Sequence, residues 1–218
     1  MPDAPRRASA LLETVRVRNG RAPLWPLHEA RLRRSALALG YSLPDALIPP
    51  SGGGDRICRL EYLSRGRSRV TERQVEELTG VRLRTSGVPH RGYRHKTSDR
   101  EWLDAARLDA ATEGADDVLL LSEEGHVAES SIWSLFWWEG DRLTAPPLEL
   151  GILPGVARAR LDELVGGVRE SRLAGPELAV RGGFAANAGR GVVPIGELDG
   201  RQVVPDPGTE ELRELFWP

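Results

Sequence analysis

The chain has 218 residues, of which 40% are hydrophobic and 28% charged, a balance typical of a globular protein of one or two domains. Its net charge of -2 argues against a nucleic-acid-binding protein, because such proteins carry clustered and unbalanced positive charge. No apolar run reaches the roughly 18 residues of a membrane span, and the first residues lack a secretory apolar stretch, so we expect a cytoplasmic protein.

The first half of the chain predicts a small α/β unit. A helix is expected after Pro26, where apolar residues recur at helical spacing, and Gly40 is its expected end. Strands are predicted at 9–17, 57–64 and 81–85. The second of these strands contains Cys58, the only cysteine, which we interpret as a core residue. A single cysteine excludes an intramolecular disulfide and a CxxC metal site, and no metal site is predicted.

The second half is predicted to be rich in hairpins. After a linker-like stretch at 87–94, Ser98 and Glu101 have the spacing of a capping box, which predicts a helix running to about Glu113. Glycine-containing turns then separate apolar and aromatic runs, and Trp133, like its neighbours at 136–138, is interpreted as core. Since hairpins outnumber strand–helix–strand units, the pattern favours an α+β fold over a doubly wound sheet.

Lys96 is the only lysine among 30 basic residues, and all the others are arginine. Arginine can replace lysine wherever only positive charge is needed, but its guanidinium cannot form an imine. Lys96 also precedes the predicted helix, whose positive end, together with Arg94, Arg100 and His95, should disfavour the ammonium form. We therefore interpret Lys96 as a reactive amine rather than as a surface lysine kept by chance.

Three other features are compatible with a cofactor, although each has an ordinary alternative. Glu129 ends an apolar strand, where a glutamate is commonly just exposed. The segment 151–156 leads into a helix whose free N–H groups could bind phosphate, although a Pro-Gly helix start is commonly only a turn. Arg31 lies beside Arg33 and Arg34 in a run that normally forms a solvated helix face.

Seven segments between Leu11 and Ile195 together resemble a known family. They are LLETVRVRNGR (11–21), HEARLRRSALALG (28–40), SRG (64–66), HKTSDR (95–100), GADDVLLLSEEGHVAESS (114–131), LFWWEGDRLTAPPLELGILPGVAR (135–158) and FAANAGRGVVPI (184–195). In this order they resemble the class IV aminotransferases, which are fold-type IV enzymes dependent on pyridoxal 5'-phosphate, and most closely aminodeoxychorismate lyase. The opening strand is similar to lyase domains that are fused to aminodeoxychorismate synthase subunits.

The resemblance implies an architecture and partners. It implies a small N-terminal α/β domain and a larger C-terminal pseudo-barrel, which we expect at 1–88 and 96–218 with a linker at 89–95. It also implies a homodimer, a small-molecule amino substrate and a possible aminodeoxychorismate synthase partner.

The resemblance further implies roles for individual residues. Lys96 would bind the cofactor as a Schiff base, and Glu129 would accept a hydrogen bond from the pyridine N–H. The phosphate would be bound by Arg31 and by backbone amides of Val156, Ala157 and Ala188. Many relatives have hydroxyl residues in place of these two alanines, and Ser134 replaces a usual asparagine. The phosphate is thus expected to depend on backbone N–H groups and Arg31.

Three functions follow from the resemblance. The first is a 4-amino-4-deoxychorismate lyase that releases 4-aminobenzoate and pyruvate in folate biosynthesis. The second is a transaminase acting on branched-chain or D-amino acids. The third is a non-catalytic relative, which is suggested by the alanines at 157 and 188 where many relatives have hydroxyl residues. Candidate partners for substrate carboxylates are Arg59, Arg65, Arg84 and Arg94.

Overall fold

The computed structural model describes residues 10–63 and 68–218, and the chain divides into two compact units. The first unit comprises Met1–Val75 and His95–Glu101, and the second comprises Glu76–Arg94 and Trp102–Pro218. The SRG motif at 64–66, with Arg65, and the first residue of the predicted strand at 9–17 lie outside the described residues.

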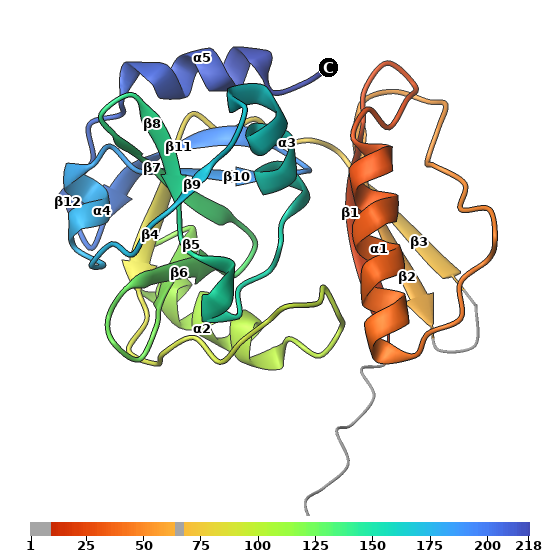
Figure 1. Ribbon diagram of the computed structural model, residues 1–218, viewed down its shortest axis with the longest axis horizontal. Helices are drawn as coiled ribbons and strands as arrows, with labels where there is room; N and C mark the ends of the chain where they lie inside the picture. Colours follow the sequence, from red (N-terminus) through yellow and green to blue (C-terminus); the bar gives the residue numbers. More distant parts are fainter. Residues whose placement is uncertain (1–9, 64–67) are drawn as a thin grey trace, which may run out of the picture. The chain divides into compact units, whose positions relative to one another are not determined.

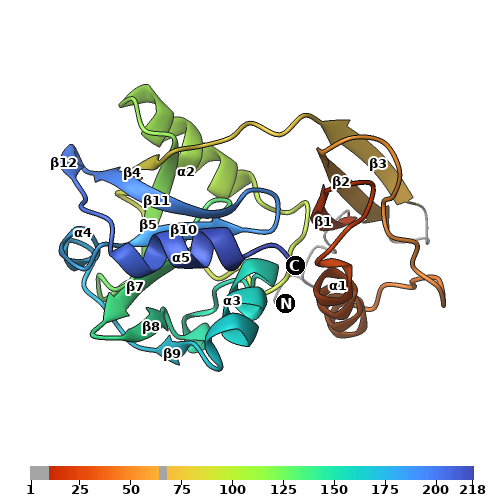
Figure 2. The ribbon, with the colours of Figure 1, turned by 90° about the horizontal axis from the view of Figure 1, so that it is seen from above.

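The first unit is a three-stranded antiparallel sheet with one helix. Its elements are β1 (Ala10–Val17), α1 (Trp25–Leu39), β2 (Arg56–Leu63) and β3 (Ser68–Arg73), and the strand order is β1-β2-β3. Helix α1 packs on β1, and Figures 1 and 2 show it running along the sheet. Gly40 ends the helix in the left-handed conformation, as predicted, and Cys58 is fully buried in this core.

The second unit is built on one nine-stranded sheet. Its elements are β4 (Val81–Thr85), α2 (Glu101–Thr112), β5 (Asp117–Leu121), β6 (Val127–Ser130), β7 (Ser134–Glu139), β8 (Arg142–Ala145), η1 (Leu148–Leu150), α3 (Val156–Val165), β9 (Arg169–Glu170), α4 (Glu177–Val180), β10 (Phe184–Asn187), β11 (Gly191–Leu198), β12 (Arg201–Gln202) and α5 (Pro207–Leu215). The strand order is β6-β5-β4-β11-β10-β7-β8-β9, with β12 paired to β11. Consecutive strands β5–β6 and β7–β8 pair antiparallel, which confirms the hairpins predicted there and the α+β class. Strands β10 and β11 form a further antiparallel pair that was not predicted.

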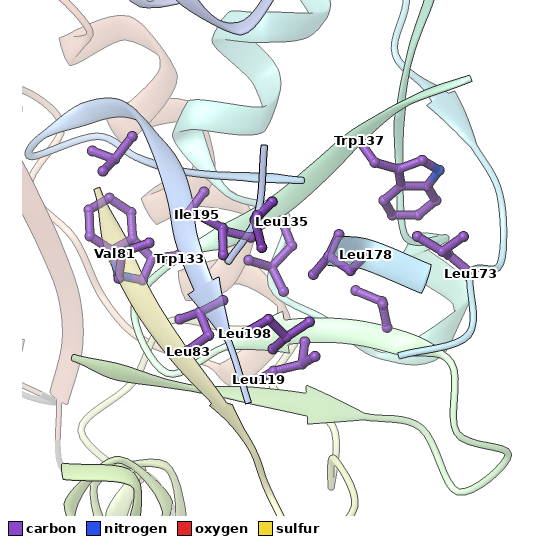
Figure 3. Packing of buried hydrophobic residues seen from close by; sticks show 14 residues of the cluster. Val81, Leu83, Leu119, Trp133, Leu135, Trp137, Leu173, Leu178, Ile195 and Leu198 are labelled. Atoms are coloured by element: carbon purple, nitrogen blue, oxygen red, sulfur yellow. The ribbon is translucent and has the colours of Figure 1, made fainter. Parts of the chain in front are cut away.

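The core of the second unit lies on this sheet. Figure 3 shows side chains gathered from β4, β5, β7 and β11, with Trp133 and Trp137 among them. Trp137 is fully buried, and Phe136 stacks on Phe184 with ring centroids 5.2 Å apart. The prediction that the aromatic run is core is confirmed for these residues. Helix α5 packs on β11 beside this sheet (Figure 2).

The two compact units do not coincide with the domains expected at 1–88 and 96–218 with a linker at 89–95. Strand β4 belongs to the second unit, because it pairs parallel with both β5 and β11. The segment His95–Glu101 belongs to the first unit, because its backbone bonds to β1. Helix α2 begins at Glu101, three residues after the predicted cap Ser98, whose hydroxyl accepts a hydrogen bond from the N–H of Ala10. None of the helices in the described parts of the chain has the length and apolarity to cross a membrane.

Replacing Leu119 by alanine should destabilise the second unit by about 2–5 kcal/mol, because the side chain is fully buried in the cluster of Figure 3 and its removal leaves a cavity. Denaturant unfolding measures this free energy. The matched control is Leu108→Ala on α2, where the side chain is 66% exposed and the change should stay within about 0.5 kcal/mol. Equal effects of the two substitutions would contradict this core.

Candidate active site

Lys96 lies in a short segment that is bonded to the first strand of the first unit. The N–H of Leu12 donates to the carbonyl of Lys96 at 2.8 Å, and the N–H of Ser98 donates to the carbonyl of Ala10 at 2.9 Å. Thr97 forms an isolated antiparallel bridge with Leu11. Residues more than 80 positions apart are thereby held side by side, and the backbone of Lys96 is fixed.

The amine of Lys96 lies in an environment that favours its neutral form. Its pKa falls from the ordinary lysine range to about 7, chiefly because burial penalises the ammonium, and then because Arg31 and Arg100 are close. Glu13 opposes this shift without reversing it. The predicted lowering is confirmed, and Arg100 is one of its causes as expected. Burial, however, outweighs every neighbouring charge.

Next to Lys96 lies a buried cluster of Glu13, His28 and Arg31, which we call the Glu13 cluster. Arg31 donates to Glu13 twice, from Nε to Oε1 at 3.0 Å and from Nη2 to Oε2 at 2.5 Å. His28 Nδ1 lies 2.6 Å from Oε2 of the same carboxylate. All three side chains are buried, whereas Arg33 and Arg34 on the same helix are exposed. Of the basic run on α1, only Arg31 points inward.

Charge and burial together determine the protonation states of this cluster. Burial alone would raise the pKa of Glu13, but Arg31 and His28 overcome it and hold the pKa at about 2. Burial lowers the pKa of His28, so the ring is neutral and its Nδ1–H donates to Glu13. Because Glu13 occupies only Nε and Nη2 of the guanidinium, Nη1 of Arg31 is left to donate to an anion.

Glu129 lies in β6 of the second unit and is buried, not exposed as strand-end glutamates commonly are. Its Oε1 lies 2.6 Å from Nε2 of His90, and its Oε2 accepts a hydrogen bond from the N–H of Leu153 at 3.3 Å. A carboxylate oxygen can accept two hydrogen bonds, so each oxygen retains acceptor capacity for a further donor.

The start of α3 is a candidate anion site in the same unit. Gly155 is the N-cap, no side chain caps the helix, and Val156 and Ala157 are buried. Buried helix-start N–H groups need an acceptor, which a phosphate can supply. Helix α3 packs on β10, which Ala188 directly follows. A Cβ on Gly155 would meet the hydroxyl oxygen of Ser134, so this hydroxyl lies beside the helix start.

Of the candidate carboxylate partners, Arg59 is among the charges that lower the pKa of Lys96, after burial, Arg31 and Arg100. Arg84 and Arg94 belong to the second unit, where Arg84 pairs with an acidic side chain and Arg94 donates to a main-chain carbonyl. Arg65 lies outside the described residues.

Sequence reasoning missed two carboxylate contacts. Glu13 could have been found, because it alternates with Leu11 and Val15 on an apolar face of β1, where a charged residue is unexpected. His90 gives no such signal, since its partner Glu129 is 39 residues away and the turns between them carry no fixed spacing.

These residues provide a neutral amine, a buried carboxylate and two kinds of anion donor. The amine and guanidinium belong to the first unit, and the carboxylate and helix start belong to the second. Each matches in kind one group of a cofactor with an aldehyde, a ring nitrogen that carries a proton, and a phosphate. Over residues 10–63 and 68–218, His, Cys, Asp and Glu form no group of three or more that could hold a metal ion.

Comparison with known families gives one match. The sequence model of the family described as amino-transferase class IV matches residues 59–198. No curated protein sequence matches the chain.

Solved structures with the same fold include three of particular use. An amino-acid aminotransferase, provisionally assigned, from Mesorhizobium loti is 28% identical over 86% of this chain and 99% of its own, with a TM-score of 0.76. A provisionally assigned 4-amino-4-deoxychorismate lyase from Legionella pneumophila is 23% identical over 99% and 94%, with a TM-score of 0.81. A branched-chain amino acid aminotransferase from T.th., complexed with N-(5'-phosphopyridoxyl)-L-glutamate, is 20% identical over 95% and 83%, with a TM-score of 0.76. The expected fold-type IV class is confirmed.

Acylation of Lys96 should be half-maximal near pH 7, because an amine reacts only when neutral and the pKa of Lys96 is about 7. As the chain has one lysine, mass spectrometry of the labelled peptide reads this amine directly. Arg31→Met should move the midpoint to higher pH, since it removes a positive charge beside the amine. A wild-type midpoint near 10 would contradict the buried site.

Glu13→Gln should lower the free energy of unfolding by about 3–5 kcal/mol at neutral pH, because it leaves Arg31 buried without its anion. The folded-state pKa of Glu13 lies below its unfolded value, so its contribution is complete above about pH 4.5 and is lost as the pH falls toward about 2. The gap between wild type and variant should narrow over that range. Glu29→Gln is the control, since its helix-surface pair with Arg33 should contribute under about 1 kcal/mol.

Proposed function

The chain belongs to the class IV aminotransferase family, and from this premise we propose that it is a pyridoxal-phosphate enzyme with 4-amino-4-deoxychorismate lyase activity. One observation carries the proposal. The only lysine of the chain has a buried amine whose pKa is about 7, beside the Glu13 cluster. A lysine that is neutral near physiological pH can both bind a carbonyl carbon and act as a base.

The identity of the cofactor is supported by the donor set and by a relative. The 20% identical branched-chain aminotransferase was crystallised with a phosphopyridoxyl compound, and this chain shares its fold. When bound, pyridoxal phosphate supplies an electron sink for the carbon that bears the substrate amine. The amine of Lys96, the carboxylate of Glu129 and the uncapped start of α3 match the three groups of this cofactor that a protein must bind.

Each proposed residue has a distinct role toward the cofactor. Lys96 Nζ would hold the aldehyde carbon, and Glu129 would accept a hydrogen bond from the ring N–H. Arg31 donates to the phosphate from Nη1, because Glu13 fixes the rest of its guanidinium. The backbone N–H groups of three further residues also bind the phosphate in this proposal: Val156, Ala157 and Ala188. None of the three has a side-chain hydroxyl that could help.

Lys96 also moves the proton in the proposed reaction. With substrate bound, the amine of Lys96 would be free, and it would be neutral in about half of the molecules at pH 7. Neutral Nζ then removes the proton from the carbon that bears the substrate amine. Burial, and after it the charges of Arg31 and Arg100, keep the pKa of this ammonium low, so that it can return the proton.

The lyase assignment concerns the bond that breaks after proton removal. Loss of the enolpyruvyl ether as pyruvate leaves 4-aminobenzoate, and aromatisation makes this step effectively irreversible. The substrate carries carboxylates, and Arg59 is the proposed partner for one of them because its charge acts on Lys96. The ordered segments, above all HKTSDR at 95–100, favour this member of the family.

Transamination is the second candidate, and the 28% identical protein from Mesorhizobium loti favours it. It uses the same Lys96 and Glu129 and differs in where the proton returns. Its substrates would be branched-chain or D-amino acids with 2-oxoglutarate. The third candidate is a non-catalytic relative, which the absence of side-chain hydroxyls at Ala157 and Ala188 suggests.

A folate-biosynthesis role, a cytoplasmic location, a homodimer and an aminodeoxychorismate synthase partner also belong to this proposal. They follow from the resemblance to lyases. The mass of the purified protein in solution, alone and mixed with such a synthase subunit, tests the last two.

Adding pyridoxal phosphate to the wild-type protein should produce a visible absorbance band that Lys96→Ala lacks. Lys96→Arg is the matched control, because it keeps the positive charge but cannot bind the aldehyde. Turnover should fall by at least about a thousandfold in both variants, since they lose nucleophile and base together. A wild-type protein without the band would overturn the enzyme proposals.

Incubating the wild-type protein with 4-amino-4-deoxychorismate should release 4-aminobenzoate and pyruvate in equal amounts. A parallel mixture of amino acid and 2-oxoglutarate serves as the comparison. Turnover in the second mixture alone would replace the lyase assignment with the transaminase one.

A further inference from the structure

We infer that His90 is a positioning residue that fixes the carboxylate of Glu129 toward the cofactor ring nitrogen. The inference rests on the proposed function, because it takes the role of Glu129 from there. It adds a residue to which neither the family match nor the ordered segments assign a role.

The contact itself is short and shielded from solvent. Nε2 of His90 lies 2.6 Å from Oε1 of Glu129, and the two side chains are only 2% and 8% exposed. Water therefore competes little for this hydrogen bond, so losing the donor would leave Oε1 without its partner.

The backbone determines which nitrogen of His90 carries the proton. The N–H of Gly92 donates to Nδ1 of His90 at 3.2 Å, so Nδ1 must offer a lone pair. In the neutral ring the proton then lies on Nε2, from which it is donated to Glu129. A two-residue turn in the chain thus selects the tautomer that serves the carboxylate.

The ring of His90 is also held in place by its surroundings. The backbone N–H of His90 donates to the carbonyl of Leu121 at 2.7 Å, which ties this loop to the end of β5. The side chain makes an edge-to-face contact with Trp102 of α2, with ring centroids 5.6 Å apart. Both contacts lie within the second unit, as Glu129 does.

Glu129 is consequently bonded at both oxygens to fixed donors. His90 binds Oε1, and the N–H of Leu153 binds Oε2 at 3.3 Å. Two donors from different segments fix the plane of the carboxylate, while the remaining lone pairs can accept the ring N–H. Partners of this kind tune a cofactor-binding group without touching the cofactor, as outer partners of metal ligands do.

Nitrogen NMR on the cofactor-free protein tests the tautomer alone. His90 should show a protonated Nε2 and an unprotonated Nδ1, and the signal should change in Glu129→Gln. Protonation of Nδ1 in the neutral ring would overturn the inference whatever the enzyme does.

Four variants test the role: His90→Phe, His90→Gln, Glu129→Gln, and His90→Phe combined with Glu129→Gln. The Kd for pyridoxal phosphate and kcat are measured for each, together with Tm. His90→Phe should weaken cofactor binding or kcat by on the order of tenfold, the effect of removing an outer partner. His90→Gln, which retains a side-chain N–H donor, should recover most of this loss. In the Glu129→Gln background, His90→Phe should add little, because both changes remove one interaction.

The control is His126→Phe, a histidine of the same unit that is not a partner of Glu129 in the hydrogen bonds and ion pairs of residues 10–63 and 68–218. It should leave Kd and kcat near the wild-type values. Equal effects of His90→Phe in both backgrounds, or a fall in Tm with Kd and kcat unchanged, would overturn the inference. If Glu129→Gln impairs the enzyme and His90→Phe does not, the inference fails alone. If the wild-type protein binds no pyridoxal phosphate, the inference and the proposed function both fail.

Discussion

The chemistry of this chain depends on keeping one amine neutral inside the first unit. An ammonium is costly to remove from water, and the cost rises when guanidinium groups lie near it. Arg31 and Arg100 supply that positive field at Lys96, while Glu13 is committed to Arg31 and His28 and offsets it only in part. The buried ion pair is thus arranged to leave net positive charge around the amine.

The fold explains how such a group is held. The segment that carries Lys96 is bonded to β1, the strand that carries Glu13, and α1, which carries Arg31, packs on the same strand. Amine, carboxylate and guanidinium therefore lie on β1 itself or on segments that are anchored to it. The second unit holds Glu129 in a comparable way, with a donor for each oxygen.

Much of this could be predicted from local patterns, and the remainder could not. The predicted hairpins and the end of α1 at Gly40 follow from turn residues and periodicity. The prediction that Lys96 is a reactive amine follows from its being the only lysine in a chain that otherwise uses arginine. Burial is the largest cause of the pKa shift of Lys96 and depends on residues far along the chain. The contact between Glu129 and His90 likewise joins residues that lie 39 positions apart in the sequence. The division into units differed because His95–Glu101 bonds back to β1, a long-range contact with no local signal.

The central claim is that Lys96 binds the cofactor carbonyl. Borohydride reduction of the protein in the presence of pyridoxal phosphate fixes that bond, and peptide mass spectrometry then locates it. We predict one phosphopyridoxyl group per chain, on the peptide that contains Lys96, at near-neutral pH. Modification of the N-terminal amine alone, or no modification, would contradict the account.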